Sequence, residues 1–201
     1  MAEGAEMLAL RQFRARGGVL RTAEALRLGI HPRTLYLLRD EGRIEAISRG
    51  VYRLADLPPL AHPDLVTVAL RVPNSVVCLI SALAFHEITT EVPHEVQIAL
   101  PRGTKTPKLD HPPLRVFRFS EPGLSLGVQT VNLDGIDVRI YDPAKTVVDC
   151  FRYRNKLGVD VAIEALKLCI ERKLARPADL LRYARKCRAE RVMLPYIEAL
   201  Q

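Results

Sequence analysis

Two short helical segments in close succession, followed directly by a basic hairpin, constrain this chain most strongly. Residues 22–29 (TAEALRLG) and 31–42 (HPRTLYLLRDEG) have apolar residues at helical spacing, and both segments end in glycine. Residues 43–54 (RIEAISRGVYRL) place β-forming residues on either side of a Ser-Arg-Gly turn. A helix, a short turn, a second helix and a small hairpin occur in this order in a winged helix-turn-helix, a module that usually binds DNA.

Capping signals predict where these helices begin and end. Thr22 can cap one helix through its hydroxyl, and Gly29 fits the position after its last turn, where a left-handed backbone is needed. Pro32 fits the first turn of the next helix, which leaves His31 as the cap of that helix. An earlier helix is predicted over residues 5–16. The residues expected to face the core are Met7, Leu8, Leu10 and Phe13 in this first helix and Ala23 and Leu26 in the second.

The third helix is the segment expected to contact DNA. Leu35 and Leu38 point to one side of a helical wheel, and mostly polar residues point to the other. In the hairpin, Arg49 is expected at the tip and Arg43 and Arg53 on the flanks, where arginine can reach phosphates or a minor groove. The alternative interpretation of the polar face of the third helix is an ordinary solvated surface that binds nothing. The predicted DNA-binding residues are Arg33, Thr34, Tyr36, Arg39, Arg43, Arg49 and Arg53.

A proline-rich segment divides the chain. Three prolines occur within residues 58–63, and proline interrupts both helices and strand pairing. We therefore expect a winged helix-turn-helix domain at residues 1–57, a linker at 58–63 and a C-terminal domain at 64–201.

The C-terminal domain contains both helical and strand patterns. Strands are predicted at 95–100 and 114–119, and a hairpin at 128–140 turns at Asp134-Gly135. The segments with helical character are 64–72, 76–88, the stretch that follows Asp142-Pro143, 159–173, 177–188 and the end of the chain. The expected fold class is α+β: a winged helix-turn-helix, then a mixed α/β domain with a small, mostly antiparallel sheet and a helical C-terminus.

The charge of the chain permits a polyanionic partner. Its 30 Lys and Arg exceed its 23 Asp and Glu, for a formal net charge of +7, although many basic proteins bind no nucleic acid. Basic residues gather in the C-terminal helices, where they form either a solvated surface or a docking surface for an acidic partner or DNA. The candidate partner surface consists of Arg152, Arg154, Lys156, Arg182, Arg185 and Lys186.

The sequence shows no catalytic constellation, and we expect no enzyme. The pair His86-Glu87 at a helix end is more typical of a structural role. A metal-dependent nuclease would need clustered carboxylates beside a lysine. Asp142, Lys145 and Asp149, together with Asp137, are candidates for such a cluster, but Asp142 is better explained as a helix cap and Asp149 as a surface residue.

Metal binding, export and membrane insertion are not indicated. The four cysteines lack a CxxC pair and are expected to be buried, reduced thiols: Cys78, Cys150, Cys169 and Cys187. The acidic N-terminus lacks the apolar core of a signal peptide, and no apolar run reaches the roughly 18–20 residues of a membrane span. We expect a cytoplasmic protein with no metal, no cofactor and no membrane association.

Two stretches of the chain resemble the AbiEi family, the antitoxins of type IV toxin–antitoxin systems. The N-terminal likeness lies within residues 22–54, especially in RTLY (33–36) and RGVYRL (49–54). The C-terminal likeness lies in YDPAKTVVDCFRYRNKLG (141–158), followed by AIEAL (162–166) and PYIEAL (195–200).

This resemblance implies two activities and no catalysis. The N-terminal domain would bind inverted repeats of double-stranded DNA in its own promoter and repress the operon. The C-terminal domain would counter an AbiEii-like nucleotidyltransferase toxin, without a direct complex being implied. The alternative function is a ligand-sensing winged-helix regulator that has no toxin partner.

Overall fold

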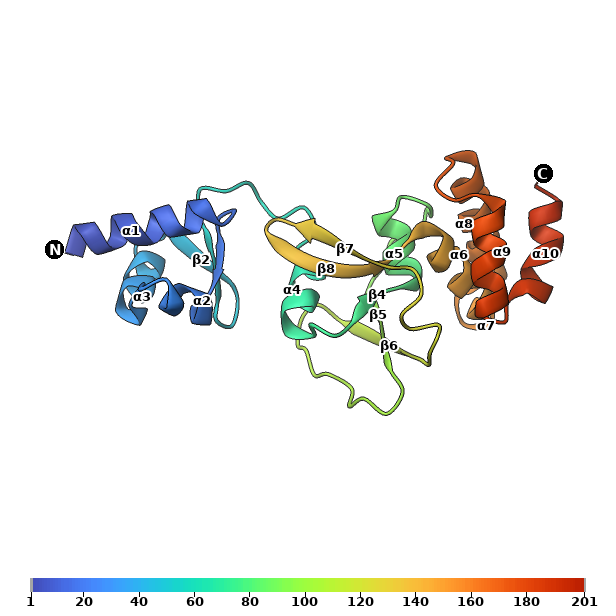
Figure 1. Ribbon diagram of the computed structural model, residues 1–201, viewed down its shortest axis with the longest axis horizontal. Coiled ribbons are helices and arrows are strands. Elements are labelled where there is room, and N and C mark those ends of the chain that lie inside the picture. Colours follow the sequence, from blue (N-terminus) through green and yellow to red (C-terminus); the bar gives the residue numbers. More distant parts are fainter. Residues whose placement is uncertain (1, 201) are drawn as a thin grey trace. The chain divides into compact units, whose positions relative to one another are not determined.

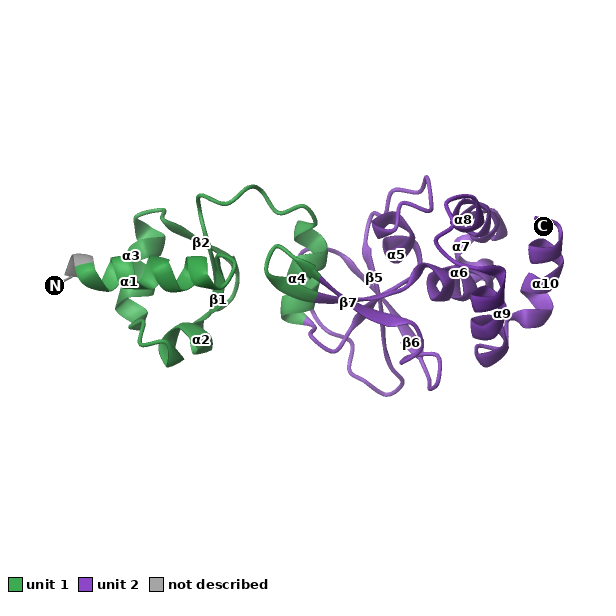
Figure 2. Cartoon of the chain, turned by 45° about the horizontal axis from the view of Figure 1, so that its top comes forward, with its two compact units in different colours: residues 1–71, 132–137 green, residues 72–131, 138–201 purple. Residues whose placement is uncertain are grey.

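The computed structural model describes residues 2–200, with side chains from residue 4 onward. The chain forms two compact units, residues 1–71 with 132–137 and residues 72–131 with 138–201 (Figure 2). Both units contain helices and strands, which confirms the α+β class. The first unit includes helix α4 (Pro63–Arg71), so it extends beyond residue 57, where the predicted N-terminal domain ends.

The N-terminal part of the first unit, residues 2–54, places three helices around a small sheet (Figure 1). Its elements are α1 (Ala2–Ala15), β1 (Val19–Arg21), α2 (Thr22–Arg27), α3 (Pro32–Asp40), β2 (Ile44–Ser48) and β3 (Val51–Leu54). The strand order is β1-β3-β2, and both pairings are antiparallel. The sequence predicted the β2–β3 hairpin but not β1. Because β1 pairs with β3, β3 is the central strand and all four of its residues are buried.

The core of this unit corrects two predictions about which helix faces are buried. Met7 and Leu8 are 67% and 48% exposed, and Leu26 of α2 is also exposed. The buried face of α1 instead consists of Ala9, Leu10 and Phe13. In α2 the buried residue is Ala25 rather than Ala23. The core is completed by Leu20, Ile30, Leu35, Leu38, Ile44, Tyr52 and Leu54.

The predicted caps hold at α3, whereas at α2 the C-terminal prediction holds and the N-cap prediction fails. Gly29 follows the C-cap Leu28 of α2 with φ +80°, as predicted. Pro32 occupies the first turn of α3, and the Nδ1 atom of His31 accepts the backbone N–H of Arg33 at 3.2 Å. Thr22 does not cap α2, because the N-cap residue is Arg21. Instead, the backbone N–H and hydroxyl of Thr22 both donate to the carbonyl of Gly50, at 2.8 and 3.2 Å. The hairpin turn is thereby attached to the start of α2.

The second unit contains a five-stranded sheet with the order β6-β5-β4-β8-β7. Its strands are β4 (Val76–Val77), β5 (Val96–Pro101), β6 (Leu114–Phe119), β7 (Val128–Leu133) and β8 (Ile136–Tyr141). The sheet is mixed rather than mostly antiparallel, because β4 pairs with β8 and β5 pairs with β6 in parallel. The predicted helix at 76–88 is also shorter, since Val76 and Val77 form β4 and the helix begins after Cys78.

The helices of the second unit pack around α6 (Pro143–Arg152), which contacts α5 (Leu79–Phe85), α8 (Val159–Glu171) and α9 (Pro177–Lys186) (Figure 1). The remaining helices are α7 (Arg154–Leu157) and α10 (Glu190–Glu198). Every residue of α6 from 144 to 151 is buried. Among the described residues, no helix combines the length and apolarity needed to cross a membrane.

Candidate nucleic-acid interface

Helix α3 has one buried and one exposed face, as the helical wheel predicts. Leu35 and Leu38 are almost completely buried and fix the helix against the core. Arg33, Tyr36 and Arg39 are exposed on the other side. Because the buried leucines fix the rotation of α3, the exposed side chains are presented in a defined direction.

A surface groove of about 650 Å³ runs along the exposed side of α3. Three of the predicted DNA-binding residues, Arg33, Thr34 and Tyr36, line this groove together. The residues that complete its lining are Ala5, Glu6, His31, Leu37 and Asp40. The structure therefore brings these three predicted residues together on one side of the helix.

Arg39 lies beside the groove and has partners within α3. Its guanidinium is over the ring of Tyr36, 5.2 Å from the centroid, and an Nη atom is 2.7 Å from Asp40 Oδ1. The hydrogen bond with Asp40 raises the pKa of Arg39 further, so the group is always charged. This ion pair is solvent-exposed and contributes little to stability, so a phosphate oxygen can replace the carboxylate at low cost.

The hairpin turn presents Arg49 to solvent. Gly50 follows it with φ +72°, a left-handed conformation that glycine adopts without strain. Neither Arg49 nor Arg33 forms an ion pair with another residue in the described part of the chain. Both guanidinium groups are therefore available to a phosphate without the loss of an existing pair.

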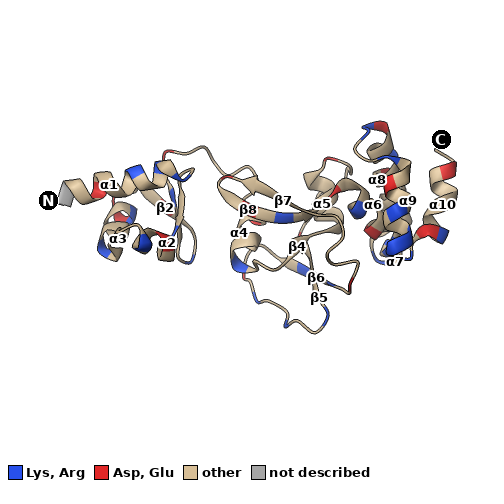
Figure 3. Cartoon of the chain, viewed as in Figure 1, with Lys and Arg blue, Asp and Glu red and all other residues tan. Residues whose placement is uncertain are grey.

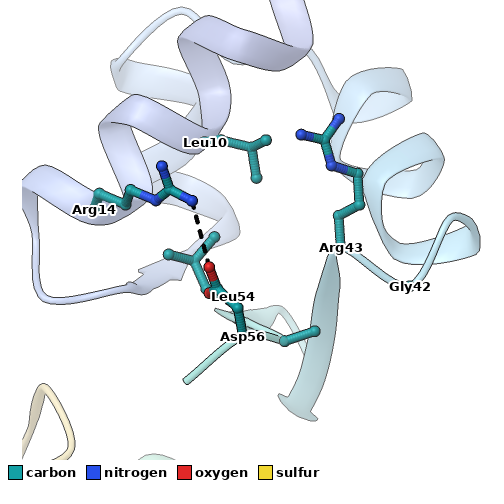
Figure 4. A pocket seen from close by; sticks show the side chains of 7 residues that line it. Leu10, Arg14, Gly42, Arg43, Leu54 and Asp56 are labelled. Carbon is teal, nitrogen blue, oxygen red and sulfur yellow. Dashed lines mark hydrogen bonds and ion pairs between the residues drawn. The ribbon is translucent and has the colours of Figure 1, made fainter. Parts of the chain in front are cut away.

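Arg43 does not itself line the groove along α3. It forms an ion pair at 3.5 Å with Glu6, which does line that groove, and it lines a pocket of about 450 Å³ beside α1. Figure 4 shows Arg43 on one side of this pocket and Arg14 on the other, with Leu10 between them.

The structure corrects the predicted position of Arg53. We expected it on the exposed flank of the hairpin, but only 4% of the residue is exposed. Its Nη1 donates to Glu45 Oε1 at 2.9 Å, and its Nη2 donates to the carbonyl of Pro58. Glu45 is its cross-strand neighbour on β2. The guanidinium of Arg53 is held between Glu45 of β2 and the chain segment at Pro58, so Arg53 stabilises the hairpin and does not face a duplex.

Three of the six residues of the predicted partner surface are paired with carboxylates. Figure 3 shows both basic and acidic positions along the C-terminal helices. Arg182 is 3.0 Å from Asp179, Arg185 is 2.6 Å from Glu190, and Arg152 is 3.2 Å from Asp149. Arg154 donates to the carbonyl of Phe151, and Lys156 and Lys186 are exposed. The six residues are divided between α9 and the α6–α7 segment.

The structure also corrects the expected position of Asp149. The side chains of Lys145 and Asp149 are fully buried and form an ion pair within α6. Burial raises the pKa of the Asp149 carboxyl, against the opposing effects of Lys145 and Arg152. A buried pair that satisfies its own charges cannot contact a substrate, so these residues do not form a nuclease site.

Asp142 acts as the predicted cap of α6. Its Oδ1 accepts the backbone N–H of Lys145 at 2.7 Å, and its Oδ2 accepts the hydroxyl of Tyr183 at 2.8 Å. Burial and this hydrogen bond raise the pKa of Tyr183 to about 12. Within the described residues, no group of three or more His, Cys, Asp or Glu side chains is arranged to hold a metal ion.

The element order and the exposed α3 are compatible with the class of helix-turn-helix regulators. Residues 8–55 match the model of a family described as "Transcriptional regulator, AbiEi antitoxin". The match runs from the second half of α1 through β3 and confirms the resemblance to the AbiEi family for this part of the chain. The family is one of transcriptional regulators and not of enzymes.

One solved structure is similar over almost the whole chain. It is described as "Crystal structure of RV2827C protein from Mycobacterium tuberculosis", with a TM-score of 0.53 and 13% sequence identity over 96% of this chain and 81% of that one. At this identity the similarity concerns the fold alone. A search of curated proteins found no match.

Proposed function

We propose that the chain is a DNA-binding transcriptional autorepressor and antitoxin, whose α1–β3 segment is a winged helix-turn-helix. In this arrangement α3 enters the major groove of double-stranded DNA and the β2–β3 turn is the tip of the wing. The observation that carries the proposal is the exposed side of α3. Two buried leucines fix this helix while Arg33 and Tyr36 point outward, and Arg33 has no carboxylate partner among the described residues.

The attachment of the hairpin turn to α2 supports the same proposal. Two hydrogen bonds from Thr22 to Gly50 hold the residue next to Arg49 at the N-terminal end of α2. These bonds fix the backbone next to Arg49, so the guanidinium of Arg49 is presented from a defined position to a DNA phosphate. From these observations, the DNA-binding residues that we propose are Arg33, Thr34, Tyr36, Arg39 and Arg49.

DNA binding is tested by titrating the protein with its own upstream promoter duplex and with a shuffled duplex of equal composition. We expect a preference for the promoter and an affinity that falls steeply with salt. Arg33→Ala is expected to remove a base contact, which costs about 1–3 kcal/mol on the promoter. Arg49→Ala is expected to weaken binding to both duplexes alike and to reduce the salt slope by about 1.

Lys167→Ala is the matched control, because it removes one exposed positive charge from the second unit. Full promoter affinity in the Arg33→Ala and Arg49→Ala double variant would show that another surface binds DNA.

The antitoxin activity that we propose resides in the second unit and counters a nucleotidyltransferase toxin. It is tested by co-expressing residues 1–201 with the toxin encoded beside its gene and scoring growth. The alternative function is a ligand-sensing regulator. It predicts that a small molecule releases the protein from DNA, and that co-expression with the toxin does not restore growth.

A further inference from the structure

The small sheet of the first unit has a second face, opposite to the one that packs on the core. Side chains alternate between the two faces along a strand, so Tyr52 and Leu54 of β3 join the core and Arg53 lies on the second face. Glu45 is opposite Arg53 on the neighbouring strand β2. The segment after β3 returns over this face, because the carbonyl of Pro58 accepts a hydrogen bond from Arg53. Arg53 is therefore buried although it is not part of the core.

A surface groove of about 580 Å³ lies on this second face, between β2, the segment after β3 and α4. Arg53 and Glu45 both line it. Its volume is within the roughly 300–1,000 Å³ of small-molecule sites. The groove shares no lining residue with the groove along α3, so it is separate from the proposed DNA-binding surface. Six residues of its lining are apolar: Ala46, Ile47, Ala55, Leu57, Pro59 and Leu60.

The guanidinium of Arg53 has one donor that the described residues leave unused. Nη1 donates to Glu45 Oε1 at 2.9 Å, and Nη2 donates to the carbonyl of Pro58. The Nε–H is buried and has no hydrogen-bond partner among the described residues. A buried donor without an acceptor is unfavourable, and more so when it belongs to a charged group. A ligand that brings an acceptor to this donor would remove the unfavourable contribution.

Glu45 is the group that such a ligand can replace. The side chain of Glu45 is 52% exposed, whereas that of Arg53 is 5% exposed, so Glu45 can rotate into solvent at little cost. Glu45 accepts one hydrogen bond from the guanidinium, through Oε1. The donors of a guanidinium form a fork that matches both oxygens of a carboxylate. A ligand carboxylate in the place of Glu45 can therefore accept from Nε–H as well as from a terminal nitrogen.

We propose that this groove binds a small monocarboxylic acid with an apolar body. The carboxylate pairs with Arg53, and the apolar body lies against the six apolar residues of the lining. Arg53 is the one cation among the lining residues, so a single carboxylate neutralises it. A ligand with several negative charges would leave the others unpaired against apolar side chains. The inference goes beyond the proposed function and does not depend on it, because binding is measured without DNA.

The test is a titration of indole-3-acetate with the full chain, followed by the fluorescence anisotropy of the indole. The chain contains no tryptophan, so the indole signal comes from the ligand. Indole-3-acetamide is the control ligand, because it has the same apolar body without the charge. We expect a Kd on the order of 0.1–1 mM for an acid of this size. The amide should bind at least about tenfold more weakly.

Two variants show whether the acid binds in the groove. Arg53→Gln should weaken binding of the acid at least about tenfold, to the level of the amide. Glu45→Gln should tighten binding of the acid by about two- to fivefold, because it removes the competing carboxylate. The matched controls are Arg115→Gln and Glu95→Gln. They alter another Arg–Glu pair, at 3.3 Å in the second unit, and should leave the Kd unchanged.

Equal affinity of the acid and the amide would overturn the inference, as would the absence of acid binding at several millimolar. An unchanged Kd in a folded Arg53→Gln variant has the same consequence. When Arg53→Gln does not fold, as judged by circular dichroism, Glu45→Gln decides, and acid binding no tighter than in the wild type refutes the site.

Promoter affinity is measured separately. Acid binding without promoter binding supports the groove and refutes the regulator, whereas promoter binding without acid binding supports the regulator and refutes the groove.

Discussion

Replacing Asp149 by asparagine is the perturbation whose outcome the structure defines most sharply. The substitution leaves the ammonium of Lys145 inside the protein without a carboxylate. The groups that then remain around its Nζ are the neutral carboxamide at position 149 and the ring faces of Tyr141 and Phe119, with centroids 4.0 and 5.1 Å away. Loss of one member of a buried pair typically costs 3–5 kcal/mol.

Removing Lys145 is expected to lower the free energy of unfolding by less than removing the charge of Asp149. In Lys145→Met, Asp149 keeps the guanidinium of Arg152 at 3.2 Å. Burial already raises the pKa of this carboxyl, so it takes up a proton more readily than an exposed one. We therefore expect a loss of about 4–5 kcal/mol for Asp149→Asn and about 3 kcal/mol for Lys145→Met. The double variant Lys145→Met, Asp149→Leu leaves no buried charge and should be more stable than either single variant.

The assay for these variants is urea unfolding at pH 7, followed by circular dichroism in the transition of the second unit. A loss below 1 kcal/mol, or a double variant less stable than both single variants, would refute the reasoning.

Two further predictions concern the same unit. Gly127→Ala should destabilise the protein by about 2–5 kcal/mol in thermal melts, because Gly127 has φ +68° and its new Cβ would be 2.5 Å from the Cβ of Lys145. Gly103→Ala is the control, because Gly103 has φ +81° but a Cβ there would meet nothing within 4 Å. It should show the backbone cost alone, about 1 kcal/mol. His86 is partly buried, with its Nε2 atom 2.7 Å from the carbonyl oxygen of Tyr141, and burial lowers the pKa of its imidazole below 6.5. The unfolded chain therefore takes up a proton on His86 at a higher pH than the folded chain, so the stability that His86 contributes above pH 6.5 is lost as the pH falls below that value. The melting temperature of the wild type should therefore drop more between pH 7 and pH 5 than that of His86→Gln, and parallel pH curves would contradict this.

The sequence was sufficient where a local signal determines the structure. His31 and Pro32 begin α3, Leu35 and Leu38 set its rotation, and Asp142 caps α6, each within a few residues along the chain. Helix α1 shows what the spacing of apolar residues cannot predict, namely which face of a helix is buried. Its apolar residues occupy two faces of the wheel, so the pattern alone does not decide which face the sheet and α3 cover.

Features that depend on distant segments could not be predicted from the sequence. Strand β1 has three residues and exists only by pairing with β3, 30 residues later. Without β1, Arg53 reads as a residue at the edge of a hairpin, although the opposing Glu45 was a visible signal of a cross-strand pair. Lys145 and Asp149 at i, i+4 spacing are typical of an exposed pair on a helix. Their burial arises because α5, α8 and α9 surround α6.

The location of the basic residues, rather than their number, argues for α3 and the hairpin turn as the DNA-binding surface. Arg182 and Arg185 of α9 have carboxylates within 3.0 Å, so phosphate binding there must compete with existing pairs. Arg33 and Arg49 have no such competitor among the described residues, and both are on elements held by buried leucines or by backbone hydrogen bonds. A charge held in place loses less side-chain and backbone freedom on binding than one on a mobile loop. For this reason we propose that a duplex binds to α3 and the hairpin turn of the first unit rather than to the paired arginines of α9.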